Sequence, residues 1–152
     1  MFKEMRRLKN QMSKEETYEL LKNTREGVLG TISSNGYPYT VVVNYVYYDN
    51  KIYFHSAKEG HKIENIKNNE FVSFTVFDNV EVVEKTFTTK YQSCTVFGRA
   101  KVLPGNKEIL LELIKKYSPN FQSSGKDYVS KGFDSTIIVE IEIDHMTGKE
   151  RL

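Results

Sequence analysis

The residues with the clearest chemical potential begin at Ser56, in the segment Ser-Ala-Lys-Glu-Gly-His-Lys-Ile. The pattern predicts that a strand ends here, that a short loop turns the chain, and that a helix begins near Gly60. Free backbone N–H groups at a helix start favour an anion, and Lys62 in the first turn would add a positive charge. With the Ser56 hydroxyl and an imidazole from His55 or His61, these groups could form a phosphate pocket. Residue chemistry alone favours the alternative, a plain strand–loop–helix joint whose lysine faces water.

The histidine and cysteine side chains give weaker indications of a functional site. The three histidines, His55, His61 and His145, are too dispersed to suggest a metal site, and the single cysteine leaves no second soft ligand. Cys94 lies in a strand-like run, which is more typical of a buried small residue than of a nucleophile. No glycine-rich dinucleotide fingerprint or phosphate loop is present. We therefore predict no metal site.

Composition excludes several classes of protein. The 152 residues suit one domain, and 39% hydrophobic with 28% charged residues is typical of a globular protein. A net charge of +2, from 22 basic and 20 acidic residues, lacks the concentrated positive charge of a dedicated nucleic-acid binder. No apolar run reaches the roughly 20 residues of a membrane-spanning helix, and no secretory signal is recognisable. We expect a cytoplasmic, single-domain protein (1–152) that interacts with neither membrane nor nucleic acid and has a solvated N-terminal arm over residues 1–12.

The elements that would position the phosphate pocket are mainly strands. Alternating apolar residues predict six strands, joined early in the chain by tight turns at Ser34–Tyr37 and Asp49–Asn50. The predicted strands are Gly27–Ser33, Tyr37–Tyr48, Lys51–Ser56, Phe71–Val83, Tyr91–Leu103 with a bulge or bend at Gly98, and Thr136–Ile143. Helices are predicted over Ser13–Thr24, over Gly60–Asn68 and after Pro104, whereas Glu84–Lys90 reads as an excursion and Phe121–Phe133 as a loop. This order predicts a mainly β fold with short helices, a closed or nearly closed antiparallel barrel.

Three runs in this order, Gly36–Asn44, Ile52–Ala57 and Gly60–Asn65, resemble the FMN-binding split-barrel superfamily, which includes the pyridoxamine 5′-phosphate oxidases. Later runs, Tyr91–Ala100 and Thr147–Lys149, resemble its 5-nitroimidazole-resistance (Nim-type) branch. The resemblance extends over nearly the whole chain, and it implies a six-stranded antiparallel split barrel that binds FMN.

The resemblance also implies which residues bind the cofactor. One strand would line the isoalloxazine ring, the end of another would lie by the ribityl chain and phosphate, two basic residues would hold the phosphate, and a polar pair would approach the flavin near a dimer seam. These cofactor-binding residues are Val41, Val42, Val43, Asn44, Phe54, His55, Ser56, Ala57, His61, Lys62, Gln92 and Ser93. Members of this superfamily are homodimers with flavin at the subunit interface, so we expect a homodimer here. The apolar residues on both faces of Phe71–Val83 agree with that expectation.

The resemblance narrows the function. Val41 and Val46 stand where pyridoxamine phosphate oxidases carry an arginine and a lysine, which disfavours vitamin B6 oxidation. His55 occupies a position that faces flavin and small-molecule substrate in the Nim-type branch, so it is a candidate catalytic proton donor, with a purely structural hydrogen bond as the alternative. The leading hypothesis is a flavin-dependent oxidoreductase that reduces nitro-aromatic or similar electron-poor small molecules. The alternatives are a non-catalytic flavin-binding stress or sensor module, or a barrel of the same kind that binds haem or a deazaflavin.

Overall fold

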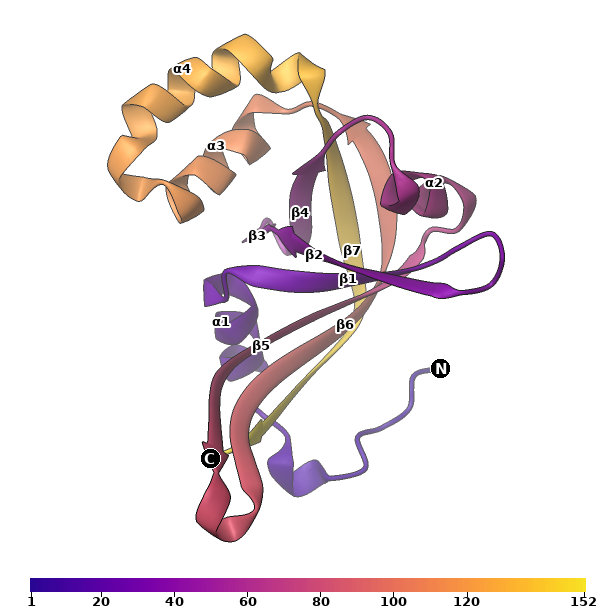
Figure 1. Ribbon diagram of the computed structural model, residues 1–152, viewed down its shortest axis with the longest axis vertical. Helices are drawn as coiled ribbons and strands as arrows, with labels where there is room; N and C mark the ends of the chain where they lie inside the picture. Colours follow the sequence, from indigo (N-terminus) through magenta and orange to yellow (C-terminus); the bar gives the residue numbers. More distant parts are fainter.

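The computed structural model describes residues 1–152, and its strands form one antiparallel sheet that curls into a half-barrel (Figure 1). The strand order across the sheet is β2-β1-β5-β6-β7-β4-β3. The strands are β1 (Glu26–Ile32), β2 (Pro38–Asn44), β3 (Val46–Tyr48), β4 (Lys51–Ser56), β5 (Phe71–Val83), β6 (Thr88–Pro104) and β7 (Ile137–Arg151). The α-helices are α1 (Lys14–Asn23), α2 (His61–Asn68), α3 (Lys107–Tyr117) and α4 (Gln122–Gly132), with short 3₁₀ turns at Leu8–Asn10, Glu84–Thr86, Pro119–Phe121 and Phe133–Ser135.

The prediction of six strands was wrong, because the predicted strand Tyr37–Tyr48 breaks at Tyr45 into β2 and β3. The backbone of Tyr45 bonds to side chains of α3 instead of to a neighbouring strand. Its N–H donates to the Tyr117 hydroxyl at 2.9 Å, and its carbonyl accepts from Nζ of Lys116 at 3.0 Å. The chain therefore leaves one edge of the sheet at β2 and joins the opposite edge at β3, which curls the sheet toward closure.

The predicted tight turns are present. Asp49 and Asn50 have φ values of 49° and 60°, as expected for the turn between β3 and β4. The predicted bulge is confirmed by a register shift between Phe97 and Gly98 in the pairing of β6 with β7. The predicted excursion at Glu84–Lys90 is shorter than expected, because its last three residues already pair with β5. Likewise β7 continues past the predicted end at Ile143 to Arg151 and pairs with β6 over this extension.

The helices follow the sequence pattern with one exception. The predicted capping box is confirmed at the start of α1, where Ser13 and Glu16 each accept a backbone N–H of the other. The prediction of a loop at Phe121–Phe133 was wrong, since this segment contains α4. Its serines and glycines weaken the helical pattern, but Gly125 allows α4 to approach α3 closely: a Cβ there would lie 2.5 Å from Cγ2 of Ile114.

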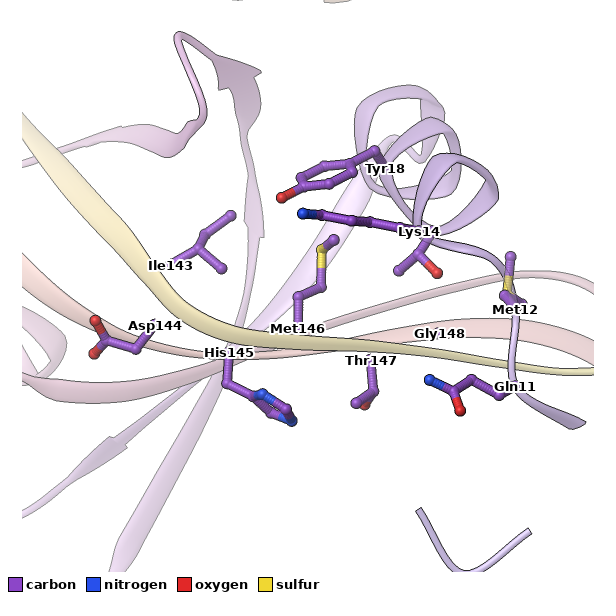
Figure 2. A pocket seen from close by; sticks show the side chains of 11 residues that line it. Gln11, Met12, Lys14, Tyr18, Ile143, Asp144, His145, Met146, Thr147 and Gly148 are labelled. Carbon is purple, nitrogen blue, oxygen red and sulfur yellow. The ribbon is translucent and has the colours of Figure 1, made fainter. Parts of the chain in front are cut away.

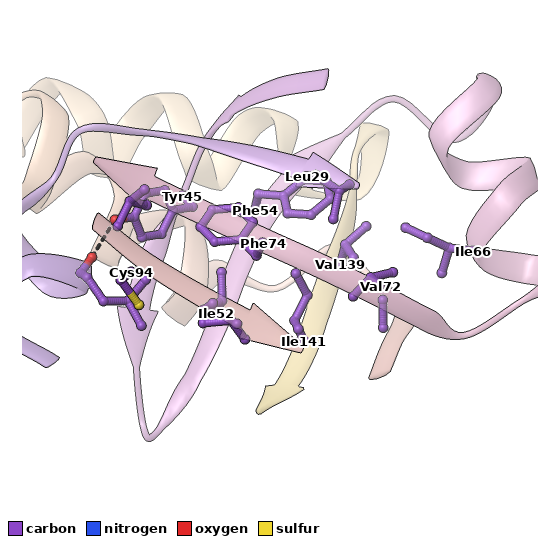
Figure 3. Packing of buried hydrophobic residues seen from close by; sticks show 14 of the residues in the cluster. Leu29, Tyr45, Ile52, Phe54, Ile66, Val72, Phe74, Cys94, Val139 and Ile141 are labelled. Carbon is purple, nitrogen blue, oxygen red and sulfur yellow. Dashed lines mark hydrogen bonds between the residues drawn. The ribbon is translucent and has the colours of Figure 1, made fainter. Parts of the chain in front are cut away.

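The buried side chains form two clusters on opposite faces of the sheet's β4 region. The larger cluster of 17 residues fills the half-barrel and includes Tyr45, Phe54 and Phe74, with the Tyr45 hydroxyl donating to the carbonyl of Leu21 (Figure 3). The rings of Tyr45 and Phe74 meet edge to face, 4.9 Å apart. The smaller cluster of seven lies between the strands and the pair α3–α4 and contains Val46, Tyr53, Ile109, Leu110, Leu113, Val129 and Ile138.

The N-terminal arm, which was expected to be solvated, is docked along β7. The Met12 N–H donates to the Gly148 carbonyl at 3.0 Å, and the Asn10 side chain donates to the Glu150 carbonyl at 2.9 Å. Phe2 stacks on His145 with ring centroids 4.7 Å apart. None of the helices is both long enough and apolar enough to cross a lipid bilayer.

Candidate functional site

The end of β4 contains the one buried side-chain polar atom without a hydrogen-bond partner, Oγ of Ser56. Ser56 is only 6% exposed and is the last residue of the strand. A buried hydroxyl that bonds to nothing costs about 1–3 kcal/mol, so such atoms are uncommon in folded proteins. An unpaired hydroxyl at this position is therefore suited to a ligand oxygen.

Four residues later, α2 begins without a side-chain cap. Its N-cap is Gly60, whose φ of 138° excludes most other residues and whose surroundings are open. The N–H groups of His61 and Lys62 have no backbone acceptor, while those of Ile63 and Glu64 donate to the Gly60 carbonyl. The first turn of α2 thus presents two unused N–H donors together with the positive end of the helix dipole.

A polar network fixes this turn to the end of β1. The Oγ of Ser33 lies 2.9 Å from Nε2 of His61, and the Tyr39 ring lies 4.0 Å from the imidazole between centroids. The buried amide of Asn65 donates to Thr31 at 2.9 Å and to Ser33 at 3.3 Å. Ser33, Tyr39 and Thr31 were not predicted as partners of this turn, although a polar Asn65 between Ile63 and Ile66 on an apolar helix face was a signal.

The surface beside this turn carries charges of both signs. A hollow of about 570 Å³ is lined by the exposed outer side of α2 and the preceding loop. Its charged residues are Lys58 and Lys67 on the one hand and Glu59 and Glu64 on the other. Gly60 and His61 at the start of α2 also line this hollow, whereas Ser56 and Lys62 do not.

The predicted ring-binding segment is β2, an edge strand whose one partner is β1. Val41 and Val43 are half-buried and pack against the larger core, whereas Val42 and Asn44 face outward and are exposed. Tyr39 joins β2 to the first turn of α2 through its contact with His61. The free edge of β2 therefore starts beside the first turn of α2.

The other predicted cofactor-binding residues do not lie together in the structure. The Phe54 side chain is fully buried in the larger core, so only its backbone is available to a ligand, while Ala57 is exposed after β4. Gln92 and Ser93 lie on the far part of β6, where the Gln92 amide donates to Glu150 at 3.0 Å. Ala100 of β6 bonds to Glu70, just after α2, and Ser93 lies seven residues further away, about 23 Å along the strand. One chain therefore does not bring Gln92 and Ser93 to the start of α2.

His55 and Ser56 project to opposite faces of β4. His55 pairs with Ile138, which belongs to the smaller cluster under α3 and α4. Ser56 lies on the same face as Phe54, which belongs to the larger core. Burial lowers the pKa of His55, and its ring has no hydrogen-bond partner within the chain. The predicted catalytic histidine thus faces the α3–α4 side and not the start of α2.

A separate cavity of about 380 Å³ lies between the N-terminal arm, α1 and β7 (Figure 2). Lys14, Tyr18 and Met146 lie on one side of β7, and His145 and Thr147 on the other. No group of three histidine, cysteine, aspartate or glutamate side chains is arranged to hold a metal ion. Cys94 is fully buried, and burial raises the pKa of its thiol to about 12, which makes it a poor nucleophile.

Comparison with known proteins assigns this arrangement to a fold. A conserved hypothetical protein of Mycobacterium tuberculosis is similar with a TM-score of 0.82 and 18% identity, over 97% of this chain and 90% of that chain. A candidate 5-nitroimidazole antibiotic resistance protein of Bacteroides thetaiotaomicron is similar with a TM-score of 0.73 and 20% identity, over 92% of this chain and 86% of that chain. A FAD-binding protein of Mesorhizobium loti is similar with a TM-score of 0.64 and 26% identity, over 93% of this chain and 97% of that chain. No curated protein matches the chain. The family model for pyridoxamine 5′-phosphate oxidase matches residues 13–150, which confirms the resemblance seen in the sequence. Because this match covers almost the whole chain, the protein belongs to the pyridoxamine 5′-phosphate oxidase family.

Proposed function

We propose that this protein binds FMN and acts as a flavin-dependent oxidoreductase on small electron-poor molecules, nitro-aromatic compounds among them. The observation that carries the proposal is the unpaired, buried Ser56 hydroxyl followed by the uncapped start of α2. A phosphate monoester would accept hydrogen bonds from Ser56 and from the N–H groups of His61 and Lys62, and the Lys62 ammonium would balance its charge. The residues present therefore fit the terminal phosphate of FMN.

The isoalloxazine ring would lie along β2. The exposed Val42 and Asn44 and the unpaired edge of this strand offer an apolar contact, an amide and backbone hydrogen-bonding groups. Such a combination suits a flat ring with one apolar and one polar edge. Flavin binding by relatives supports this choice, since the Mesorhizobium loti protein is a FAD-binding protein.

We propose that the functional unit is a homodimer. Gln92 and Ser93 are remote from α2 within one chain, so a contact with flavin requires them to come from a second copy. The hairpin of β5 and β6 also exposes large apolar side chains, with Phe77, Val80, Val82 and Phe87 each more than half exposed. A second copy covering this hairpin would remove that surface from water. Analytical ultracentrifugation at micromolar concentration is expected to give a dimer, and a monomer would overturn the shared site.

The chemistry divides between cofactor and chain. Bound FMN supplies reversible electron transfer, while the protein binds, orients and shields it. Ser56, Lys62 and the first turn of α2 would hold the phosphate, and β2 would set the plane of the ring. The likeness to a candidate 5-nitroimidazole antibiotic resistance protein supports nitro-aromatic compounds as acceptors. The absence of charge at Val41 and Val46 argues against a phosphorylated vitamin B6 substrate.

The visible absorption spectrum of the purified protein tests the proposal. We expect a flavin spectrum, or its appearance when FMN is added, with FMN bound more tightly than riboflavin because riboflavin lacks the phosphate. The reduced flavoprotein, mixed anaerobically with a 5-nitroimidazole, is expected to return to the oxidised spectrum. A protein that remains colourless with FMN contradicts the whole proposal. A haem or deazaflavin spectrum would mean that the protein binds that cofactor instead of FMN. If flavin binds but is not reoxidised by the nitro compound, the protein is a non-catalytic flavin-binding protein and the proposed reductase activity is contradicted.

A further inference from the structure

A second cavity, of about 290 Å³, lies between α3, α4 and the neighbouring ends of β4 and β7. Leu110 and Leu113 of α3 and Val129 of α4 form its buried wall, and Phe133 closes one side. Its one charged lining residue is the exposed Lys131. The buried wall of the cavity is therefore apolar and suits an uncharged ligand.

The polar side chains that line this cavity are His55, Tyr128, Ser135 and Thr136. The hydroxyls of Ser135 and Thr136 donate to the carbonyls of Gly132 and Phe133, and Tyr128 is largely exposed, which leaves the imidazole of His55 as the buried-side polar group free to bind a ligand. No residue of the chain bonds to the ring, and burial lowers its pKa from the ordinary value of 6.5. At neutral pH the ring is consequently uncharged, with one nitrogen that donates and one that accepts. His55 can thus supply a single directional hydrogen bond to a molecule inside an apolar cavity.

Size limits the ligand further. An apolar cavity of about 150 Å³ holds benzene, so about twice that volume suits a molecule of two fused rings. We propose that this cavity binds a small, neutral, two-ring aromatic molecule that places one N–H or carbonyl group against His55. The site lies on the opposite face of β4 from Ser56, and the inference does not rest on the proposed flavin site.

Indole is a suitable probe, because it is neutral, has two fused rings and carries one N–H. The chain contains no tryptophan, so indole fluorescence can be followed without a tryptophan background. Titration of the purified protein, monitored by fluorescence anisotropy and calorimetry, is expected to show saturable binding at one site per chain. The related anion indole-3-acetate is expected to bind more weakly, because its carboxylate would be buried without a partner.

Two variants locate the bound probe. Leu113→Phe adds volume inside the cavity and is expected to abolish saturable binding, whereas the matched substitution Leu8→Phe, at an exposed position in the N-terminal arm, leaves it unchanged. His55→Phe keeps an aromatic ring but removes the hydrogen bond, and is expected to weaken indole binding about fivefold. Since His55 is partly exposed, this variant also provides a test if Leu113→Phe fails to fold.

Absence of saturable indole binding by the wild-type protein overturns the proposal. So does binding that persists in folded Leu113→Phe, because the probe would then occupy another surface. If only His55→Phe folds, an unchanged affinity in that variant likewise rejects the site.

Discussion

Oγ of Ser33 lies 2.9 Å from Nε2 of His61, and this contact joins the end of β1 to the first turn of α2. Asn65, one turn later on the same helix, donates to the same hydroxyl at 3.3 Å. The start of α2 is therefore held in place by side chains from another element. Such preorganisation lowers the ordering cost of binding.

The Ser56→Ala variant measures two effects of the unpaired hydroxyl separately, its effect on the free energy of unfolding and its effect on FMN affinity. Without ligand, the variant should be as stable as the wild type or more stable by up to about 1–3 kcal/mol, since an unsatisfied buried group is removed. With FMN, its affinity should fall about five- to tenfold. Thermal unfolding with and without FMN measures both effects. A ligand-free variant that is clearly less stable would mean that the hydroxyl already has a structural partner.

Lys62→Gln should weaken FMN binding about 10- to 100-fold, because a charge-assisted contact to the phosphate is lost. Riboflavin, which lacks the phosphate, should bind both proteins equally. Lys67→Gln, near the other end of α2, is the matched control and should change little. Parallel losses for FMN and riboflavin would place Lys62 away from the phosphate.

Tyr117→Phe should destabilise the fold by about 1–3 kcal/mol, because the hydroxyl forms hydrogen bonds with the backbone between β2 and β3. It accepts from the Tyr45 N–H at 2.9 Å and can donate to the carbonyl of Tyr45 or Arg25. Tyr128→Phe, at a ring that is 77% exposed, is the control and should be neutral. Urea unfolding measures the difference, and equal midpoints for the two variants would contradict this role.

Glu140 should make stability depend on pH in the acid range. Burial raises the pKa of this carboxyl, but hydrogen bonds from Tyr53 and Lys51 and the charges of Lys51 and Lys101 outweigh it, so the pKa lies below its ordinary value of 4.5. The folded state thus binds this proton more weakly than the unfolded state. The stabilisation is complete above pH 4.5 and is lost as the pH falls through the folded-state pKa.

The matched variant is Glu140→Gln, which keeps the shape of the side chain and removes the charge. Its free energy of unfolding, measured by urea titration at several pH values, should fall less steeply than that of the wild type below pH 4.5. Identical slopes for the two proteins would show that Glu140 does not contribute to the acid sensitivity.

Local chemistry was sufficient for some features of this protein. The capping box of Ser13 and Glu16, the turn at Asp49–Asn50 and the strand–loop–helix joint before His61 all depend on residues close in sequence, so their patterns could be read directly. The ordered motifs also indicated the family.

The tertiary structure alone decided the remaining points. The break at Tyr45 depends on Lys116 and Tyr117, about 70 residues later, and α4 depends on the fit of Gly125 against Ile114. Only the packing of α3 and α4 gave His55 an apolar cavity and left Ser56 beside the larger core. A residue's sequence neighbours determine its local backbone, whereas the elements that pack against it determine which face is buried and what its side chain can bind.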